Sequence, residues 1–468
     1  MSNVTSILAE LSATRSLKEK EAILRANADN DGLKQAFAVA YSKELNFFVR
    51  GLRVPFFTAG LTPLSESVDL LVKNIAGRVY TGDDAKSYMT QLVQTCEEPG
   101  TLLKIINRDL ECGIQTTLTN KVWKDLVTEP PYQSYTLFKE DLLRKFNYKG
   151  AFSDEKMDGL YADIMVWPEQ VIYRSRDGKE LNFRAPENVE RALMQAAVDD
   201  DGTAKPYVAH GEGLVIDPNG LHGVMERAEG NGYLNQDPAD IDRNRVRLVI
   251  WDYVTMDEYI VRKSKRPYIS RRLSAQGLAA WVEDKEHMQF VKGRKINSLK
   301  EAIDHFIEVR LQKKEGTVLK EADMPWGDNK TKKGVKLKNE FDVDLEVVGT
   351  IRHKKDPALI GSLICQTRDG LLEVGVGSGL TDSLRKKPAE FFIGQIITIK
   401  ANDITKSETK ELQSLFLPRL NYKFVEIRMD KTVANSLPEV IEASDSLLGL
   451  LRAIAEDLEG SGHHHHHH

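Results

Sequence analysis

The chain has 468 residues, and its 65 lysines and arginines against 70 aspartates and glutamates give a formal net charge of −5. A typical domain has about 150 residues, so the length predicts about three domains and excludes a single small module. The hydrophobic fraction of 41% and the charged fraction of 29% exclude a wholly disordered chain and a coiled-coil rod. No apolar run approaches the roughly 18 residues of a membrane helix, so we expect a cytoplasmic protein without a membrane partner. The three cysteines are widely spaced and odd in number, which fits a reducing compartment and speaks against a zinc site.

Helical patterns fill the first part of the chain. Apolar residues at Val4, Ile7, Leu8 and Leu11 follow the i, i+3, i+4, i+7 spacing of a helix. The stretch 16–19, Ser-Leu-Lys-Glu, has the form of a capping box and predicts the start of a second helix. Pro130-Pro131 interrupts this pattern and predicts a linker. We therefore expect an all-α domain over residues 1–129.

Short β-branched runs replace the helical pattern after about residue 150. Strands are expected over 159–167 and 171–176, and Asp177-Gly178 is a dipeptide that favours a hairpin turn. Further strands are expected over 207–210, 247–253, 316–320 and 335–338, with helices over 187–197 and 299–311. This mixture predicts an α+β domain with an antiparallel sheet over residues 130–340.

The last part of the chain is nearly all strand. The expected strands cover residues 341–352, 362–368, 371–376, 395–401 and 412–417. Five short strands in this span suit a small barrel of the oligonucleotide-binding (OB) kind. An amphipathic helix over 437–458 completes the expected domain 341–458, and residues 459–468 are a linker and a His tag.

Two basic stripes stand out on this mildly acidic chain. Residues 261–275 hold six cations and no acid, and residues 329–338 hold five lysines and no acid. A solvated surface is the ordinary explanation for such stripes, and a phosphate-binding face is the alternative.

Lys156-Met157-Asp158-Gly159 begins the first strand expected in the middle domain. A lysine whose amine is neutral is a covalent nucleophile, and nearby cations or desolvation favour the neutral form. The carboxylate of Asp158 would orient the amine, and Gly159 would let the backbone approach a ligand. These four letters alone are also typical of a surface turn.

An ordered series of polar motifs follows Lys156. They are Ser175-Arg176-Asp177-Gly178, His210-Gly211-Glu212-Gly213, Trp251-Asp252-Tyr253, Lys314-Glu315-Gly316, Lys336-Leu337-Lys338 and Arg428-Met429-Asp430-Lys431. Side chains alternate along a strand, so Lys336 and Lys338 are expected on one face. A nucleophilic lysine, two carboxylates for a divalent ion and a surplus of cations together indicate nucleotidyl transfer.

This series resembles the signature motifs of the ATP-dependent DNA ligases, most closely the bacteriophage type, over essentially the whole chain before the tag. The family belongs to the covalent nucleotidyltransferases, with RNA ligases and capping enzymes, and capping enzymes lack a comparable helical domain. The resemblance implies an enzyme that seals 3′-hydroxyl/5′-phosphate nicks in double-stranded DNA through a lysyl-AMP intermediate and adenylated DNA. It also implies a monomer that encircles DNA, in the host cytoplasm if a phage encodes it.

The resemblance also implies a role for each motif residue. Lys156 would take AMP from ATP, and Mg²⁺ would be held by Glu212 and Glu315. The other nucleotide-binding residues would be Asp154 near the adenine, Arg176 with Glu212 at the sugar, Tyr253 stacked on the base, Lys336 and Lys338 at the α-phosphate, and Arg428 and Lys431 at the pyrophosphate. The DNA-binding residues would be Arg108, Lys121 and Arg271.

Three departures from the family pattern leave alternatives open. Tyr161 stands where the family usually has an arginine, His210 replaces an aspartate, and Lys330 replaces an arginine. The alternatives are an RNA ligase or capping-type nucleotidyltransferase, and a catalytically silent nucleic-acid-binding relative, to which Tyr161 gives some weight.

Overall fold

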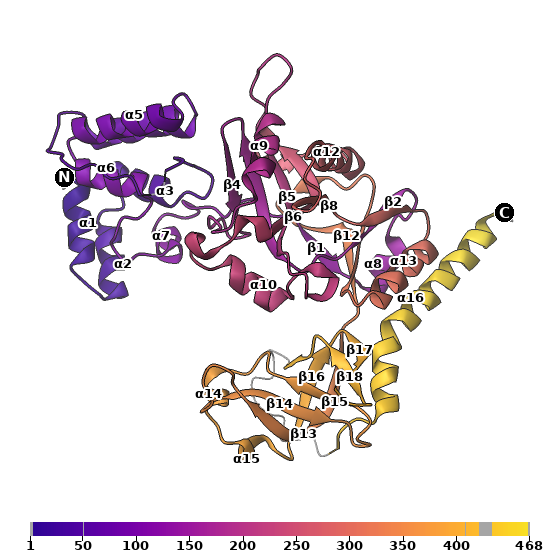
Figure 1. Cartoon of the computed structure of the whole chain (residues 1–468). Helices are drawn as coiled ribbons and strands as arrows, with labels where there is room; N and C mark the ends of the chain where they lie inside the picture. The colour runs from indigo at the N-terminus through magenta and orange to yellow at the C-terminus, as the bar shows by residue number, and fades with distance from the viewer. Residues whose placement is uncertain (1–2, 50, 408, 421–432, 467–468) are drawn as a thin grey trace. The chain divides into compact units, whose positions relative to one another are not determined.

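The computed structural model describes residues 3–49, 51–407, 409–420 and 433–466, with side chains as far as residue 460 (Figure 1). The chain forms two compact units. Unit 1 consists of Met1–Tyr132, Leu160–Lys263 and Ala275–Gln289, and unit 2 of Gln133–Gly159, Ser264–Ser274 and Phe290–His468. The domain boundaries expected after residues 129, 340 and 458 remain predictions. Among the described residues, no helix has the length and apolar character needed to cross a membrane.

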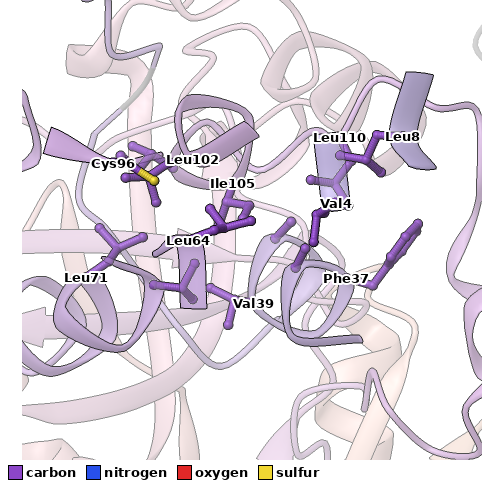
Figure 2. Packing of buried hydrophobic residues seen from close by; sticks show 14 of the residues in the cluster. Val4, Leu8, Phe37, Val39, Leu64, Leu71, Cys96, Leu102, Ile105 and Leu110 are labelled. Carbon is purple, nitrogen blue, oxygen red and sulfur yellow. The ribbon is translucent and has the colours of Figure 1, made fainter. Parts of the chain in front are cut away.

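The N-terminal part of unit 1 is helical, as predicted. Its helices are α1 (Val4–Ser12), α2 (Leu17–Ala26), α3 (Asp31–Tyr41), α4 (Leu64–Leu71), the π-helix η1 (Val72–Ala76), α5 (Gly82–Thr95), α6 (Pro99–Ile106) and α7 (Thr116–Val122). The Ser16 side chain caps α2 by accepting a hydrogen bond from the backbone N–H of Glu19. The apolar face of α1 packs with α3, α4 and α6 in one hydrophobic core (Figure 2). Burial of these faces stabilises helices that would be marginal in isolation.

The second part of unit 1 is a five-stranded sheet in the order β4 (Gln170–Arg174), β3 (Leu160–Trp167), β5 (Tyr207–Val215), β6 (Val246–Thr255) and β8 (Met288–Phe290). The pairs β4–β3, β3–β5 and β5–β6 are antiparallel, as expected. The other elements are α9 (Glu187–Gln195), η2 (Leu221–Gly223), α10 (Arg227–Leu234), η3 (Pro238–Asp240), η4 (Arg243–Arg245) and α11 (Met256–Ile260). Gly178 has φ +85°, which glycine adopts without strain, at the predicted Asp177-Gly178 turn.

Unit 2 contains a second five-stranded sheet, in the order β1 (Ser134–Leu137), β12 (Lys330–Lys338), β10 (Gly316–Lys320), β2 (Ala151–Glu155) and β9 (Gly293–Ile296). The pairs from β12 to β9 are antiparallel, but β1 runs parallel to β12, which the expected antiparallel sheet did not include. Helices α8 (Glu140–Lys145) and α13 (Leu299–Leu311) share a hydrophobic core with this sheet. The short strands β7 (Lys263–Ser264) and β11 (Trp326–Gly327) pair separately. Helix α12 (Tyr268–Trp281) begins in unit 2 and ends in unit 1.

The C-terminal strands of unit 2 form a five-stranded antiparallel sheet. Its order is β15 (Glu373–Val376), β14 (Ile360–Gln366), β13 (Phe341–Arg352), β16 (Ile396–Ala401) and β19 (Arg419–Leu420), beside the pair β17 (Asp403–Lys406) and β18 (Gln413–Phe416). Two short helices, α14 (Asp382–Arg385) and α15 (Ala389–Phe392), connect its strands. The strands predicted in this region are confirmed, and their closure into an OB barrel remains a prediction.

The last helix, α16 (Leu437–His466), joins two hydrophobic cores of unit 2. Val440 lies in the core of the C-terminal sheet. Leu447, Leu451 and Ile454 lie in the core formed with α8 and α13. Residues between 440 and 454 of the predicted C-terminal helix therefore pack into both of these cores.

Candidate active site

Three predicted site residues meet at one edge of the unit 2 sheet. Lys156 directly follows β2, and its backbone N–H donates to the carbonyl of Gly316 at the start of β10 (2.9 Å). The Lys156 Nζ lies 3.1 Å from Glu315 Oε2, and the Lys338 Nζ lies 3.2 Å from Glu315 Oε1. We call Lys156, Glu315 and Lys338 the open triad, because the side chains of its two lysines are 17% and 23% exposed.

Surplus positive charge surrounds the open triad. Burial alone would raise the pKa of Glu315, but Lys156 and Lys338 outweigh burial and hold that pKa below its ordinary value. The Glu315 carboxylate is therefore ionised at neutral pH. Burial lowers the pKa of Lys336, and the charges of Lys156, Lys338 and Lys330 lower it further. A cluster with more cations than acids attracts an anionic ligand such as a phosphate.

A second group of predicted residues shares one face of the unit 1 sheet. Tyr161 on β3 is the cross-strand partner of Glu212 on β5, which puts both side chains on the same face. The Tyr161 ring lies 5.0 Å from the Tyr132 ring and 6.1 Å from the Trp251 ring. The Arg176 guanidinium lies 4.6 Å from the centre of the Tyr132 ring. Burial raises the pKa of Tyr132, Arg176 opposes that shift and Glu212 adds to it, so both charges act on this ring.

Tyr253 was the aromatic residue predicted to stack on the base, and the structure puts it on the opposite face from Glu212. Tyr253 pairs with Ala209 and stacks on the Tyr207 ring at 5.0 Å. Tyr207 is fully buried. The aromatic residue on the Glu212 face is Trp251, at the point where the β5–β6 register shifts. The register shift beside Trp251 separates Tyr253 from Glu212, so this arrangement does not support stacking of Tyr253 on a base at the Glu212 face.

Two departures from the family pattern, Tyr161 and His210, contact the same carboxylate. The Tyr161 hydroxyl donates to Asp163 Oδ1 (2.8 Å), and His210 Nδ1 lies 2.8 Å from the same oxygen. The Tyr259 hydroxyl donates to the other oxygen of Asp163 (3.2 Å). Asp163 is 1% exposed, so this hydrogen-bonded group is a buried part of the Glu212 face of the sheet.

Asp154 was predicted to sit near the adenine, and the structure holds its side chain inside unit 2. Asp154 is 1% exposed, and its Oδ2 accepts from Arg272 NH1 (2.7 Å) and Lys320 Nζ (2.9 Å). We call Asp154, Arg272 and Lys320 the sealed triad. The sequence reading assigned no role to Arg272 or Lys320. The sequence did contain signals for both residues. Arg272 belongs to the first basic stripe, and Lys320 ends strand β10, which begins directly after Glu315.

The predicted DNA-binding residues differ in their surroundings. Arg271 is fully buried, and its NH1 donates to the carbonyls of Arg266 (2.6 Å) and Met324 (2.7 Å), so its guanidinium is used inside the fold and a DNA contact is not supported. Arg108 donates to the carbonyl of Leu45 (3.0 Å), and burial lowers the pKa of Arg108 to about 10. Arg271 is therefore structural in this arrangement, whereas a DNA contact by Arg108 stays a prediction.

Lys121, the third predicted DNA-binding residue, lies on the surface. Its side chain is 64% exposed and its Nζ lies 3.1 Å from Glu21 Oε1. A DNA contact by Lys121 therefore stays a prediction. Arg428 and Lys431, the predicted pyrophosphate contacts, lie outside the described residues.

The carboxylate of Glu315 has the chemistry of a magnesium ligand. It is ionised, and Mg²⁺ prefers oxygen ligands. Both of its oxygens are already paired with lysines, so a cation at Glu315 would compete with the Lys156 and Lys338 ammonium groups. Among the described residues, no three histidines, cysteines or acids come together as a metal-binding group.

Known proteins resemble the chain over most of its length. Residues 133–338 match the family model of the ATP dependent DNA ligase domain. The DNA ligases of Enterobacteria phages T4 and T6 are each 26% identical over 500 residues, covering 96% of this chain and 100% of the relative. A solved structure of the ATP-dependent DNA ligase from bacteriophage T7 in complex with ATP is 13% identical, with a TM-score of 0.39 over 62% of this chain and 98% of that chain.

Proposed function

Because this chain belongs to the ATP-dependent DNA ligases, we propose that Lys156 is the nucleophile that takes AMP from ATP. The observation that carries this role is the open triad, in which the Lys156 amine lies 3.1 Å from the ionised Glu315 carboxylate. Glu315 orients the amine, and the neighbouring Lys336 and Lys338 supply the positive charge that a triphosphate requires. The family model and the phage relatives favour a DNA ligase over an RNA ligase or a capping-type enzyme.

In the first step a bond forms between Lys156 Nζ and the α-phosphorus of ATP, while the bond from that phosphorus to pyrophosphate breaks. Lys156 must lose its ammonium proton before its amine can attack the α-phosphorus. Lys336 and Lys338 stabilise the negative charge that spreads over the phosphate oxygens in the transition state. The resulting phosphoramidate holds AMP on the enzyme.

Two further transfers complete the proposed reaction. The AMP passes from Lys156 to the 5′-phosphate of a nick in duplex DNA, and the 3′-hydroxyl of the nick then attacks that phosphate and releases AMP. The helical part of unit 1, with the exposed Lys121, would contact DNA. In unit 1, Arg176 and Glu212 would bind the nucleotide sugar, and Trp251, in place of Tyr253, would stack on the base.

Glu212 and Glu315 are the proposed ligands of Mg²⁺. The bound ion would neutralise charge on the transferring phosphate. A cation at Glu315 would share that carboxylate with the ammonium groups of Lys156 and Lys338, which lie 3.1 Å and 3.2 Å from its oxygens. Glu315→Gln keeps the shape of the side chain and removes its charge, so it should raise the Mg²⁺ concentration needed for activity.

Labelling with α-³²P-ATP tests the proposal directly. The wild-type protein should become labelled, and the label should be acid-labile because a P–N bond is hydrolysed by acid. Lys156→Ala should remain unlabelled, and peptide mapping should find AMP on Lys156. Label on Lys156→Ala would refute the assignment. Adding nicked duplex DNA should then chase the label into free AMP, whereas labelling by GTP or sealing of RNA alone would favour the alternatives.

A further inference from the structure

The sealed triad lies inside unit 2, close in sequence to Lys156. Asp154, Arg272 and Lys320 are 1%, 4% and 2% exposed. The Tyr268 hydroxyl lies 3.1 Å from Arg272 NH1, 3.3 Å from Lys320 Nζ and 3.4 Å from Asp154 Oδ2. One carboxylate oxygen therefore has two cations and a phenol around it.

Aromatic rings separate the two cations from water. The Arg272 guanidinium lies 4.3 Å from the centre of the Phe152 ring and 4.9 Å from that of Phe290. The Lys320 Nζ lies 5.4 Å from the centre of the Tyr135 ring. A cation held against the face of a ring in a dry environment gains electrostatic stabilisation and loses freedom to move. The position of the Asp154 carboxylate is therefore tightly fixed.

The sealed triad joins three elements that are far apart in the sequence. Asp154 belongs to β2, Lys320 to β10, and Arg272 to α12. Lys156 comes two residues after Asp154, where the strand ends, and its backbone N–H is bound by β10 through Gly316. Fixing Asp154 against β10 and α12 consequently fixes the backbone that carries the Lys156 amine.

Burial of three ions is an inefficient way to stabilise a fold. Removing charged groups from water costs several kcal/mol per ion, and apolar residues of the same size often stabilise a core as well or better. A buried ion group does impose one arrangement on the elements that share it. This property suits a place where a nucleophile must be held within a fraction of an ångström.

We propose that the sealed triad positions Lys156, with Arg272 and Lys320 acting through Asp154. This inference rests on the proposed role of Lys156. In this reading Asp154 holds the strand in place and is not a direct contact of the adenine. Loss of the sealed triad should slow the attack of Lys156 on ATP. It should leave intact the last step, in which the 3′-hydroxyl of the nick is the nucleophile.

The experiment measures single-turnover labelling of the full chain by α-³²P-ATP. Arg272→Gln should lower the labelling rate constant about tenfold to a hundredfold, because small misplacements of a nucleophile have effects of this size. Arg272→Lys should recover part of the rate, since it keeps the charge but loses the planar group against Phe152. Tyr268→Phe removes one hydroxyl and no charge, so it should fold normally and show a smaller decrease. The matched control is Arg294→Gln, because Arg294 lies on β9, next to β2, and forms a surface ion pair with Glu308 of α13.

Sealing of a nick that already carries AMP separates positioning from folding. That step should stay within about threefold of wild type in Arg272→Gln and Tyr268→Phe. Equal losses in both steps would overturn the proposal, because they would indicate a general structural defect. Wild-type labelling rates in both variants would also overturn it. Neither of these two results would contradict the proposed function. That function is refuted only if the wild-type protein is not labelled on Lys156.

Discussion

The open triad and the sealed triad have the same arrangement of charge and opposite surroundings. Each is a carboxylate between two cations beside strand β10 of unit 2, and the sealed triad also includes Arg272 of helix α12. In the open triad the lysine side chains are 17% and 23% exposed, whereas in the sealed triad the cationic side chains are 5% and 3% exposed. The contrast teaches that the charge pattern alone does not indicate the role of such a group.

Solvent access decides what each carboxylate can do. The lysines paired with Glu315 are partly exposed to solvent, so a change of partner at Glu315 does not require the exposure of a fully buried ion. Asp154 cannot exchange its partners without exposing buried charge, because Tyr268 and the rings around Arg272 occupy the space. The open triad suits a reaction in which charged ligands bind and leave, and the sealed triad suits a rigid structural role.

The largest expected difference between the two triads is in stability. Lys320→Ala leaves Asp154 and Arg272 imperfectly paired in the interior, and losing one partner of a buried ion pair costs about 3–5 kcal/mol. Lys338→Ala removes a partly exposed cation from Glu315, which keeps Lys156, so the cost should be within about 1 kcal/mol. Urea unfolding of both variants measures the difference. Equal losses would mean that the two triads play the same structural part.

The rate of AMP transfer should depend more on the open triad than on the sealed triad, which is the reverse of the order expected for stability. Glu315→Gln should lower the rate of AMP transfer to Lys156 about a hundredfold, the size of effect seen when one preorganised electrostatic group is removed. Its unfolding midpoint should change little by comparison with Lys320→Ala. The measurement is single-turnover labelling across a series of Mg²⁺ concentrations. Wild-type labelling at the ordinary Mg²⁺ optimum would remove Glu315 from the catalytic group.

Glycine substitutions probe the tight packing beside the sealed triad. A Cβ on Gly293 would overlap Asp154 Oδ1 and lie 2.6 Å from the carbonyl oxygen of Ser153, so Gly293→Ala should cost about 1–3 kcal/mol. Gly277→Ala is the matched control in α12, where a Cβ meets no atom within 4 Å. That control should stabilise the protein by about 1 kcal/mol, since alanine favours a helix. Thermal unfolding measures both variants. An unchanged melting temperature for Gly293→Ala would mean that the strand around Asp154 is not rigid.

Lowering the pH should weaken both triads, and this is the smallest of the expected effects because it is absent near neutral pH. Burial raises the pKa values of Asp154 and Glu315, but the neighbouring cations outweigh burial and hold both values below the ordinary 3.8 and 4.5. Their contribution to stability is therefore complete above those ordinary values and is lost as pH falls through the lower folded pKa values. Urea midpoints measured from pH 7 down to about pH 3 should decrease more steeply for wild type than for Glu315→Gln. Parallel curves would contradict the assigned shift of Glu315.

The sequence by itself determined the elements whose patterns are local. It predicted the bounds of β10, α13 and β13 as the structure has them, because alternation and helical spacing are properties of neighbouring residues. It also brought Lys156, Glu315 and Lys338 together, through motifs whose order along the chain resembles a known family. The charges of Arg176 and Glu212, the predicted sugar contacts, both act on Tyr132 in the structure.

Only the tertiary structure decided which way individual side chains point. The register shift in β6 puts Trp251 on the Glu212 face and leaves Tyr253 behind it, and one displaced residue in a strand reverses the faces that follow. The basic stripe likewise divides, because the arginines at 271 and 272 turn inward to carbonyls and to Asp154. Their partners lie about fifty to more than a hundred residues away, on strands that no local pattern could have placed beside them.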